Sequence, residues 1–398
     1  MTGPAWDPLE ASYKRDPHPI WRRLRDEAPV YRNEELDFFA LSRFADVMAA
    51  SRDPRTFSSA HGTVLELMTE QPLANMLIFL DPPEHTMLRR LVSRAFTPRR
   101  VAEIEEKVRA LCAELLDAQR GADRFDYVAD FGAIVPATVI AMLLGVPPAD
   151  RPAVRELIDL LFHLDPKTGM VNDVSAKAMF TLHGYLGEQL EERRLAPRDD
   201  LLSDLVTAEV AEPDGTTRRL TPEEAATFAG LLVSAGTETV GRLLGWAGAV
   251  LADHPDERAA LVADRSLVGN AVEELLRFEA PSPVQGRWTH EAVELHGVRI
   301  PAGSKVLLLT GSAGRDERAF EDPDRFDVRR HFDQHLSFGY GIHFCLGAAL
   351  ARLEGRVAIE ETLDRFPAWD VDAEHSEFQF TSTVRGFSRL PVVVSARA

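Results

Sequence analysis

The sequence of 398 residues predicts a mainly α-helical protein with small β-sheets. Helical patterns dominate from about residue 83 to residue 279, whereas residues 292–310 alternate in polarity and carry two turn signals, as strands do. No linker rich in Pro, Gly or Ser divides the chain. We therefore expect a single domain, residues 1–398. It would comprise a β-rich N-terminal part over about 1–60, the helical core, and a part over about 280–398 that combines β structure with a glycine-flanked cysteine.

Each predicted element follows from local signals. Near the N-terminus, "DPHPIWRRLRDEA" has helical periodicity, and "VYRN" and "FFALS" are typical of short strands. A long helix begins after Thr221, which can form a capping box with Glu224, and it continues to about Ala252, long enough to cross the core. Apolar side chains at helical spacing after Cys345 predict another helix, and the tail after Phe366 predicts short strands.

Composition and charge exclude several classes of protein. Hydrophobic residues make up 45% of the chain, and a net charge of −18 argues against nucleic acid as a partner. The N-terminus lacks the apolar core of a signal peptide. The most apolar long stretch, Phe228–Leu251, contains Glu238 and Arg242, so we expect no membrane span and a cytoplasmic protein. Cys112 and Cys345 form no disulfide framework, and Cys112 lies on an apolar helical face typical of a core residue.

Cys345 lies in "HLSFGYGIHFCLGAAL", where glycines surround a thiol at the predicted start of a helix. Backbone N–H groups and the helix dipole favour a thiolate there, and Gly341 and Gly347 allow close approach to a flat, bulky group. Three interpretations compete: a plain core cysteine, a zinc ligand near His335 and His343, or the single axial thiolate of a haem iron. Zinc needs three or four ligands at characteristic spacing, and no second cysteine is near.

The segment resembles the cysteine loop of the cytochrome P450 family, F-x-x-G-x-H-x-C-x-G. Five residues stand at that spacing: Phe338, Gly341, His343, Cys345 and Gly347. The resemblance implies the cytochrome P450 fold, with haem b (iron protoporphyrin IX) between the long central helix and the helix that follows the cysteine loop. It also implies that Cys345 is the iron ligand and that Phe338 and Gly347 bind the cofactor.

The long helix contains "LLVSAGTETVG", in which Gly236 costs about 1 kcal/mol relative to Ala and needs a reason. Taken alone, the stretch could be a packing site, bent by a hydrogen bond from Thr239 to a backbone carbonyl. It is similar to the family's oxygen-binding motif, A-G-x-E-T. The resemblance implies that Ala235 contacts the cofactor and that Gly236 leaves room for dioxygen. It implies catalytic roles for Thr239, as a hydrogen-bond donor to dioxygen, and for Glu238, in proton relay.

Two further sets of residues gain meaning from the resemblance. Glu274 and Arg277 stand at i, i+3 on a helix, a pair that is worth little when exposed. By resemblance they form a buried structural network with Arg325 that supports the cysteine loop. Haem carries two propionates and calls for cationic partners. The family pattern assigns these to His85, Arg89, Arg287 and His335, each of which alone is more typical of a surface charge or a satisfied polar group.

The resemblance also indicates which segments form the substrate pocket. The residues found there are mostly apolar, so we expect a hydrophobic or amphipathic small molecule as substrate. They are Leu77, Ile78, Leu232, Ala235, Val284 and Phe387.

By resemblance the activity is monooxygenation, in which O₂, two electrons and two protons convert RH to ROH and water. The sequence has no flavin, nicotinamide or iron–sulfur fingerprint, so electrons would come from NAD(P)H through a reductase and a ferredoxin. Arginines between residues 89 and 100, with Arg352 and Arg356, form a candidate docking patch, although basic runs are often merely solvated. We expect a monomer. A peroxide-driven peroxygenase and a non-enzymatic haem-binding sensor are the alternatives.

Overall fold

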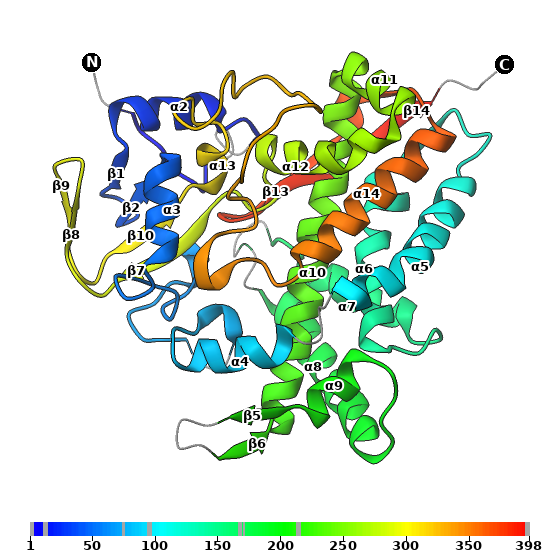
Figure 1. Cartoon of the computed structure of the whole chain (residues 1–398), viewed down its shortest axis with the longest axis horizontal. Coiled ribbons are helices and arrows are strands. Elements are labelled where there is room, and N and C mark those ends of the chain that lie inside the picture. The colour runs from blue at the N-terminus through cyan, green and yellow to red at the C-terminus, as the bar shows by residue number, and fades with distance from the viewer. Residues whose placement is uncertain are drawn as a thin grey trace.

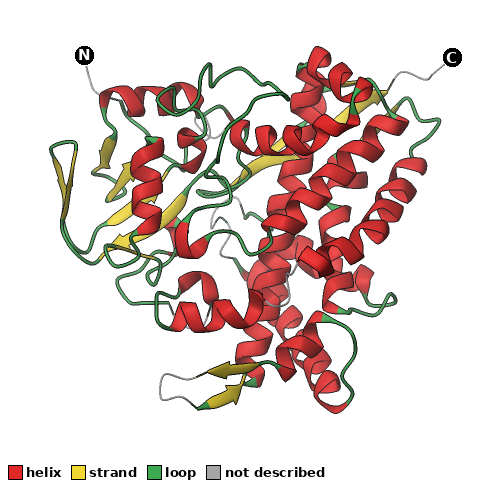
Figure 2. Ribbon diagram, in the orientation of Figure 1, coloured by secondary structure: helices red, strands yellow, loops and turns green. Residues whose placement is uncertain are grey.

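The fold is mainly α-helical with small β-sheets, as the sequence predicts (Figure 2). The computed structural model describes residues 4–10, 15–73, 76–93, 98–165, 169, 172–211 and 216–394. The helices are α2 (His18–Glu27), α3 (Phe44–Arg52), α4 (Glu84–Ser93), α5 (Pro98–Asp117), α6 (Ile134–Leu144), α7 (Arg151–Leu161), α8 (Asp173–Leu195), α9 (Leu201–Thr207), α10 (Pro222–Asp253), α11 (Pro255–Ala263), α12 (Val268–Phe278), α13 (Thr310–Ala313) and α14 (Ala348–Arg365).

The strands are short and lie mainly in the N-terminal and C-terminal parts of the chain. They are β1 (Val30–Asn33), β2 (Phe38–Leu41), β3 (Phe57–Ser58), β4 (Arg124–Asp126), β5 (Glu209–Ala211), β6 (Thr217–Arg219), β7 (Gln285–Thr289), β8 (Val293–Leu295), β9 (Val298–Ile300), β10 (Lys305–Leu308), β11 (Trp369–Val371), β12 (Glu377–Phe380), β13 (Arg385–Arg389) and β14 (Pro391–Val394).

Helix α10 is the central element of the helical part and runs across the molecule (Figure 1). Its N-terminus has the predicted capping box: Thr221 Oγ1 accepts from the Glu224 N–H (3.1 Å), and Glu224 Oε2 accepts from the Thr221 N–H (2.8 Å). Helices α6, α8 and α14 pack against it. Cys112 on α5 is buried in the core that α5 shares with α10 and α14, as predicted. Within the described ranges, no helix has the length and apolar character needed to cross a membrane.

The largest sheet joins strands from two distant parts of the chain, in the order β1–β2–β10–β7–β3. Strands β2 and β10 are parallel, and the other neighbours are antiparallel. In the pair β7–β10, Gln285 lies opposite Leu308 and Arg287 opposite Val306. Side chains alternate along a strand, so Gln285 and Arg287 point to one face of the sheet, and Val284, directly before β7, points to the other.

A buried ion-pair network ties α12 to the segment that leads into the cysteine loop. Glu274 is fully buried, and its carboxylate accepts from Arg277 Nε (2.7 Å) and Nη2 (2.8 Å) on the same helix. The third side chain in this network is Arg330, whose Nε lies 3.1 Å from Glu274 Oε1. Arg277 and Arg330 also donate to backbone carbonyls between residues 314 and 325, so the network fixes the path of that segment.

The prediction that Arg325 belongs to this network is wrong. Its side chain is 62% exposed and pairs with Asp327 at a distance of 3.6 Å. Only the backbone carbonyl of Arg325 takes part, as an acceptor from Arg330 (2.9 Å). The next residue, Phe326, is buried against the ring of Phe278, so the preceding side chain is directed outward.

Replacing Arg330 with Ala is expected to destabilise the protein by about 1.5–3 kcal/mol, the range for hydrogen bonds to a charged group, because Glu274 stays buried. Arg325→Ala is the matched control, and loss of its exposed pair is expected to change stability by less than about 1 kcal/mol. Denaturant unfolding of both variants measures the difference. Equal losses would contradict this assignment of the network.

Candidate active site

A large cavity lies between α10, β7 and the segment that carries Cys345. It encloses about 1550 Å³ of space not occupied by atoms, part of which opens to solvent.

The cysteine loop brings the Cys345 side chain to the cavity wall. Gly341 is required by the loop itself, because its φ is +70° and a Cβ there would lie 2.4 Å from the carbonyl oxygen of Ser51. The Cys345 N–H donates to the Phe338 carbonyl (2.8 Å) and closes the loop directly before α14. Gly347 is different, since a Cβ there would meet nothing within 4 Å, and this residue also lines the cavity. Phe338 lines the cavity as well.

The electrostatics of the protein alone do not make Cys345 a thiolate. Burial raises the pKa of the thiol above its usual value, although the Gly347 N–H, Arg89 and Arg352 act in the opposite direction. A metal cation at the sulfur would reverse this balance, because coordination deprotonates a thiol. In the described part of the chain, no three His, Cys, Asp or Glu side chains are grouped so as to hold a metal ion, and the zinc interpretation therefore lacks ligands.

Opposite the cysteine loop, α10 presents Ala235, Gly236 and Thr239 to the cavity. A Cβ at Gly236 would touch only the side chain of Ile140, at 3.7 Å, which is an ordinary contact. Packing within the protein therefore does not require glycine there, and its effect is to enlarge the cavity. The Thr239 hydroxyl donates to the Ala235 carbonyl (2.9 Å), which fixes its oxygen at the cavity wall.

Glu238 is buried on another face of α10 and does not line the cavity. Its Oε1 accepts from Arg242 Nη2 one helical turn further on (3.2 Å). Burial raises the pKa of Glu238 above its usual value, and the charge and hydrogen bond of Arg242 oppose this rise. The acid and the hydroxyl of the predicted pair thus face different surroundings, so the Glu238 carboxyl reaches the cavity only if it rotates or acts through water.

Basic side chains with unmet hydrogen-bonding capacity surround one end of the cavity. Arg287 is buried, and its Nη1 donates to the Gly286 carbonyl (2.7 Å) without a carboxylate partner among the described residues. His343 lines the cavity beside Arg89, and His85 packs on His343 with 4.4 Å between ring centroids. Neither ring nitrogen of His85 has a partner, and His343 Nε2 also lacks one. Burial lowers the pKa of His85 to about 4 and that of Arg287 to about 10.

His335 does not belong to this group, and its prediction as a cofactor-binding residue is wrong. Both of its ring nitrogens have protein partners, since Nδ1 accepts from the Ser337 N–H (3.1 Å) and Nε2 lies 3.2 Å from Glu273 Oε2. Glu273 is also held by Arg352 (2.6 Å). His335 therefore supports the cysteine loop, and His343, to which sequence analysis gave no cofactor-binding role, lines the cavity instead.

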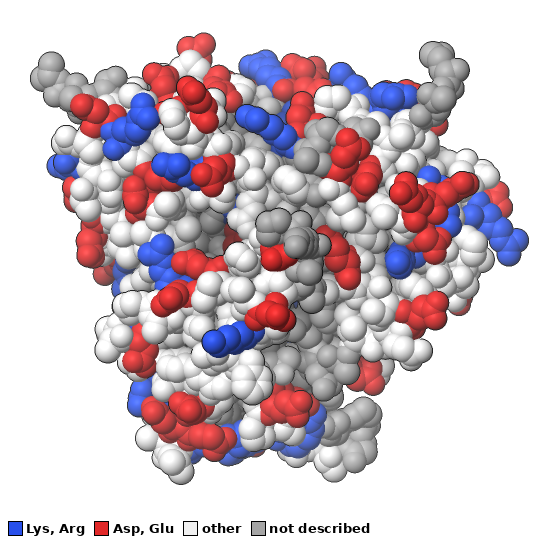
Figure 3. All heavy atoms as spheres, turned by 180° about the vertical axis from the view of Figure 1, so that it is seen from behind, with Lys and Arg blue, Asp and Glu red and all other residues white. Residues whose placement is uncertain are grey.

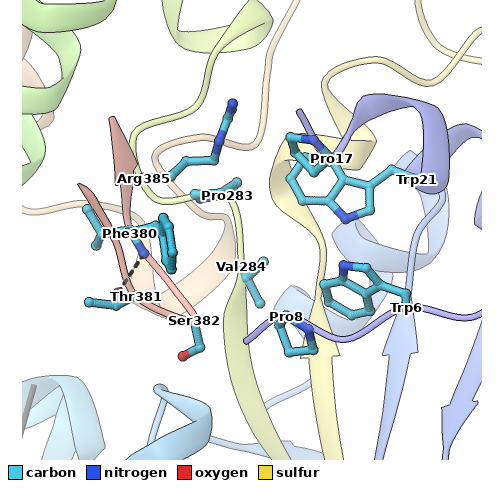
Figure 4. Close-up of a pocket in the computed structure, with 11 residues that line it drawn as sticks. Trp6, Pro8, Pro17, Trp21, Pro283, Val284, Phe380, Thr381, Ser382 and Arg385 are labelled. Carbon is cyan, nitrogen blue, oxygen red and sulfur yellow. Dashed lines mark hydrogen bonds between the residues drawn. The ribbon is translucent and has the colours of Figure 1, made fainter. Parts of the chain in front are cut away.

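Four of the six predicted substrate-pocket residues line the cavity: Leu77, Ile78, Leu232 and Ala235. The other two predictions are wrong. Val284 points to the opposite face of the sheet and lines a small pocket with Trp6 and Trp21 (Figure 4). Phe387 on β13 packs against Trp246 of α10 and does not line the cavity.

Sequence analysis missed a buried acid in the same wall. Glu354 on α14 is 1% exposed and lines the cavity, and its Oε2 has no hydrogen-bond partner. Burial raises the pKa of its carboxyl to about 8, so the group is neutral at pH 7. Helical periodicity places Glu354 on the inner face of α14. No sequence signal distinguishes this unpaired acid from Glu360 and Glu361 on the same helix, which form ion pairs with arginines.

The donor set fits a haem. Among the described residues that line the cavity, Cys345 is the one cysteine, and its sulfur would hold the iron. Among the described residues, Arg287, Arg89, His85 and His343 form no ion pair, as expected of groups that bind propionates. Glycines at 236 and 347 leave space on both walls that a Cβ would reduce.

Comparison with known proteins agrees with this reading. Residues 47–392 match the family model "Cytochrome P450". A putative cytochrome P450 from Mycobacterium tuberculosis is 40% identical over 98% of this chain and 97% of its own length. The vitamin D(3) 25-hydroxylase of Pseudonocardia autotrophica is also 40% identical, again over 98% and 97%. The structure of a cytochrome P450 from Chondromyces apiculatus is 36% identical, with a TM-score of 0.89 and 100% of each chain covered.

The family match covers most of the chain, and the relatives align with almost their whole length. The chain therefore belongs to the cytochrome P450 family, whose members are haem b monooxygenases.

Proposed function

We propose that this cytochrome P450 inserts one oxygen atom of O₂ into a hydrophobic or amphipathic small molecule by hydroxylation or epoxidation. We propose further that NAD(P)H supplies the electrons through a reductase and a ferredoxin. The observation that carries the proposal is the arrangement of one cavity, with Cys345 on one wall and Gly236 and Thr239 of α10 on another. A haem held by a cysteine thiolate supplies the electron donation that favours O–O cleavage.

Different residues would hold the iron and the propionates of the haem. Cys345 would hold the iron, and Arg89, Arg287, His343 and His85 would bind the propionates. Each of the two arginines donates to one backbone carbonyl, and among the described residues both ring nitrogens of His85 and the Nε2 of His343 have no partner. This arrangement neutralises buried positive charge and orients the cofactor.

Thr239 and Glu238 would supply protons. The Thr239 hydroxyl lies at the cavity wall and donates its one hydrogen to the Ala235 carbonyl, so it would have to leave that carbonyl in order to donate to a ligand in the cavity. Glu238 is buried with a raised pKa, so it retains a proton to a higher pH than an exposed glutamate. Arg242 limits that rise and fixes the carboxyl.

The cavity walls and the relatives support an apolar substrate. Leu77, Leu232 and Phe228 line the cavity, and most of the surface that its wall exposes is apolar. Among the relatives are an erythromycin C-12 hydroxylase from Saccharopolyspora erythraea and a cyclomarin C epoxidase from Salinispora arenicola. A cytochrome P450 from Bacillus megaterium, 30% identical with a TM-score of 0.86, was solved in complex with corticosterone.

The candidate docking patch is smaller than the sequence predicts. Arg100 pairs with Asp204, and Arg352 and Arg356 pair with Glu273 and Glu105. Arg94 lies outside the described residues, as does the side chain of Arg99.

Two features still favour docking of an acidic partner beside the cysteine loop. Phe344, next to Cys345, is 39% exposed, and Arg90 on α4 is exposed without an ion-pair partner among the described residues. On the face opposite to that of Figure 1, acidic and basic side chains are interspersed (Figure 3). We therefore place the ferredoxin on the side of the cysteine loop.

Purified protein is expected to contain haem and to give the reduced carbonyl spectrum of sulfur-ligated iron. Cys345→His should change the spectrum to the imidazole type or abolish haem binding, whereas Cys112→Ser, the matched control, should keep the sulfur type. A colourless wild-type protein, or an imidazole-type spectrum in the wild type, would show that the ligand assignment is wrong.

Thr239→Ala is expected to lower product formed per NAD(P)H on the order of tenfold and to raise release of hydrogen peroxide. The fall stays below the roughly 10²–10⁴-fold contributed by a positioned proton donor, because water can replace the hydroxyl in part. Thr239→Ser, which keeps the hydroxyl, should stay coupled. Unchanged coupling in Thr239→Ala, or turnover with peroxide that exceeds turnover with ferredoxin and reductase, would favour a peroxygenase instead.

Reduction by an acidic ferredoxin is expected to slow as ionic strength rises, because salt screens the attraction that guides association. Arg90→Gln should reduce the rate at low salt, and Arg299→Gln on the distant β9 should not. A rate that does not depend on salt, or equal effects of both substitutions, would rule out electrostatic docking at this surface.

A further inference from the structure

Gln285 is a polar residue in the mostly apolar wall of the cavity, and two hydrogen bonds fix the orientation of its side-chain amide. Ser282 Oγ donates its single hydrogen to the Thr383 carbonyl (3.0 Å). In its contact with Gln285 (2.7 Å) the serine oxygen can therefore only accept, and the nearer atom of the Gln285 amide must be Nε2. The amide oxygen, Oε1, consequently faces away from Ser282. Two hydrogen bonds thus settle an amide orientation that is otherwise ambiguous.

The Gln285 side chain, with its unpaired Oε1, lines the cavity. Gln285 and Arg287 lie on the same face of β7, and both line the cavity. Val284, one residue earlier, points to the other face and contacts the pocket around Trp6 (Figure 4). The Gln285 backbone is used in pairing with β10, so only its side chain is free to bind a ligand. Among the described residues, Oε1 has no hydrogen-bond donor.

Because apolar residues surround Gln285 Oε1, leaving this acceptor unpaired when a ligand binds would cost binding free energy. Leu77, Leu232 and Phe228 line the same cavity, and an apolar ligand that covered Oε1 would remove it from water without replacing the hydrogen bond. A ligand with a donor in the matching place avoids that cost. Thr310, which also lines the cavity, donates to the Ser282 carbonyl (3.1 Å), so it does not supply the missing donor to Gln285.

We propose that Gln285 is a specificity-determining residue whose Oε1 accepts a hydrogen bond from the substrate. The substrate would then be a largely apolar molecule that carries a hydroxyl or N–H group, and its ketone or hydrocarbon analogue would bind less well. This inference rests on the proposed function, because it names the substrate class of the same cavity.

The test compares cyclododecanol with cyclododecanone, two apolar rings that differ in having a donor or only an acceptor. Dissociation constants for the haem-loaded protein are measured from spectral shifts and by calorimetry. The wild type is expected to bind the alcohol more tightly. Gln285→Met should weaken binding of the alcohol about two- to tenfold, the range for one hydrogen bond between uncharged groups, and leave the ketone unchanged.

Two further variants make the result specific. Ser282→Ala frees the amide to rotate and present its N–H groups, so the preference for the alcohol should shrink or reverse. Gln119→Met, outside the cavity, is the matched control and should leave both constants unchanged. The inference is overturned if the wild type shows no preference for the alcohol, including the case in which it binds neither ring. It is also overturned if Gln285→Met changes both constants equally or loses haem, which would place the amide at the cofactor.

The outcome is separate from that of the proposed function, because no turnover is required. A protein that binds the alcohol preferentially but forms no product with ferredoxin and reductase would retain the inference and refute the proposed reaction. A protein that hydroxylates substrates without this preference would do the reverse.

Discussion

Arg287 is buried in the wall of the cavity with a hydrogen bond to a backbone carbonyl and no carboxylate partner among the described residues. Burial of a charge is costly unless an opposite charge accompanies it, so the site is electrostatically incomplete as the polypeptide alone. His85 and His343 add no charge, because burial lowers the pKa of both, but their unpartnered ring nitrogens offer hydrogen-bonding groups nearby. The cavity is thus organised around an anionic group that the chain does not supply. The position of Cys345 is meaningful because the same cavity receives its sulfur.

The cysteine loop and α10 form two walls of the cavity, and they contribute to cofactor binding in different ways. The loop is fixed by the protein: Gly341 fits against the Ser51 carbonyl, and His335 is clamped by Ser337 and Glu273. Gly236 on α10, in contrast, has no protein contact that demands glycine, so the space that it leaves serves the cavity. Rigid support on one wall and open space on the other are what a bound macrocycle with room for a small molecule requires.

Local signals in the sequence were sufficient for the elements and for the motifs. The capping box at Thr221 fixed the start of α10, and the spacing around Cys345 identified the family. The predictions for Val284 and Arg325 were wrong because they depended on the direction in which a side chain points, and not only on its position in the sequence. Val284 and Gln285 are neighbours, and strand alternation sends only the second into the cavity. Arg325 and Arg330 are both basic residues near Glu274, and burial of Phe326 decides which of them can reach it. Such choices depend on tertiary packing, which one sequence does not contain.

Glu238, the proposed proton donor, is connected to the rest of the fold through Arg242. Its guanidinium donates to Glu238 (3.2 Å), to Gln379 Oε1 (2.7 Å) and to the Phe387 carbonyl (2.5 Å), and Gln379 in turn donates to the Phe162 carbonyl (3.0 Å) at the end of α7. The orientation of the Glu238 carboxyl therefore depends on the β12–β13 hairpin and on α7. Because Arg242 opposes the effect of burial, a shift of the hairpin that weakened this contact would raise the pKa of Glu238 further. The pKa of Glu238 thus depends on the packing of elements outside α10.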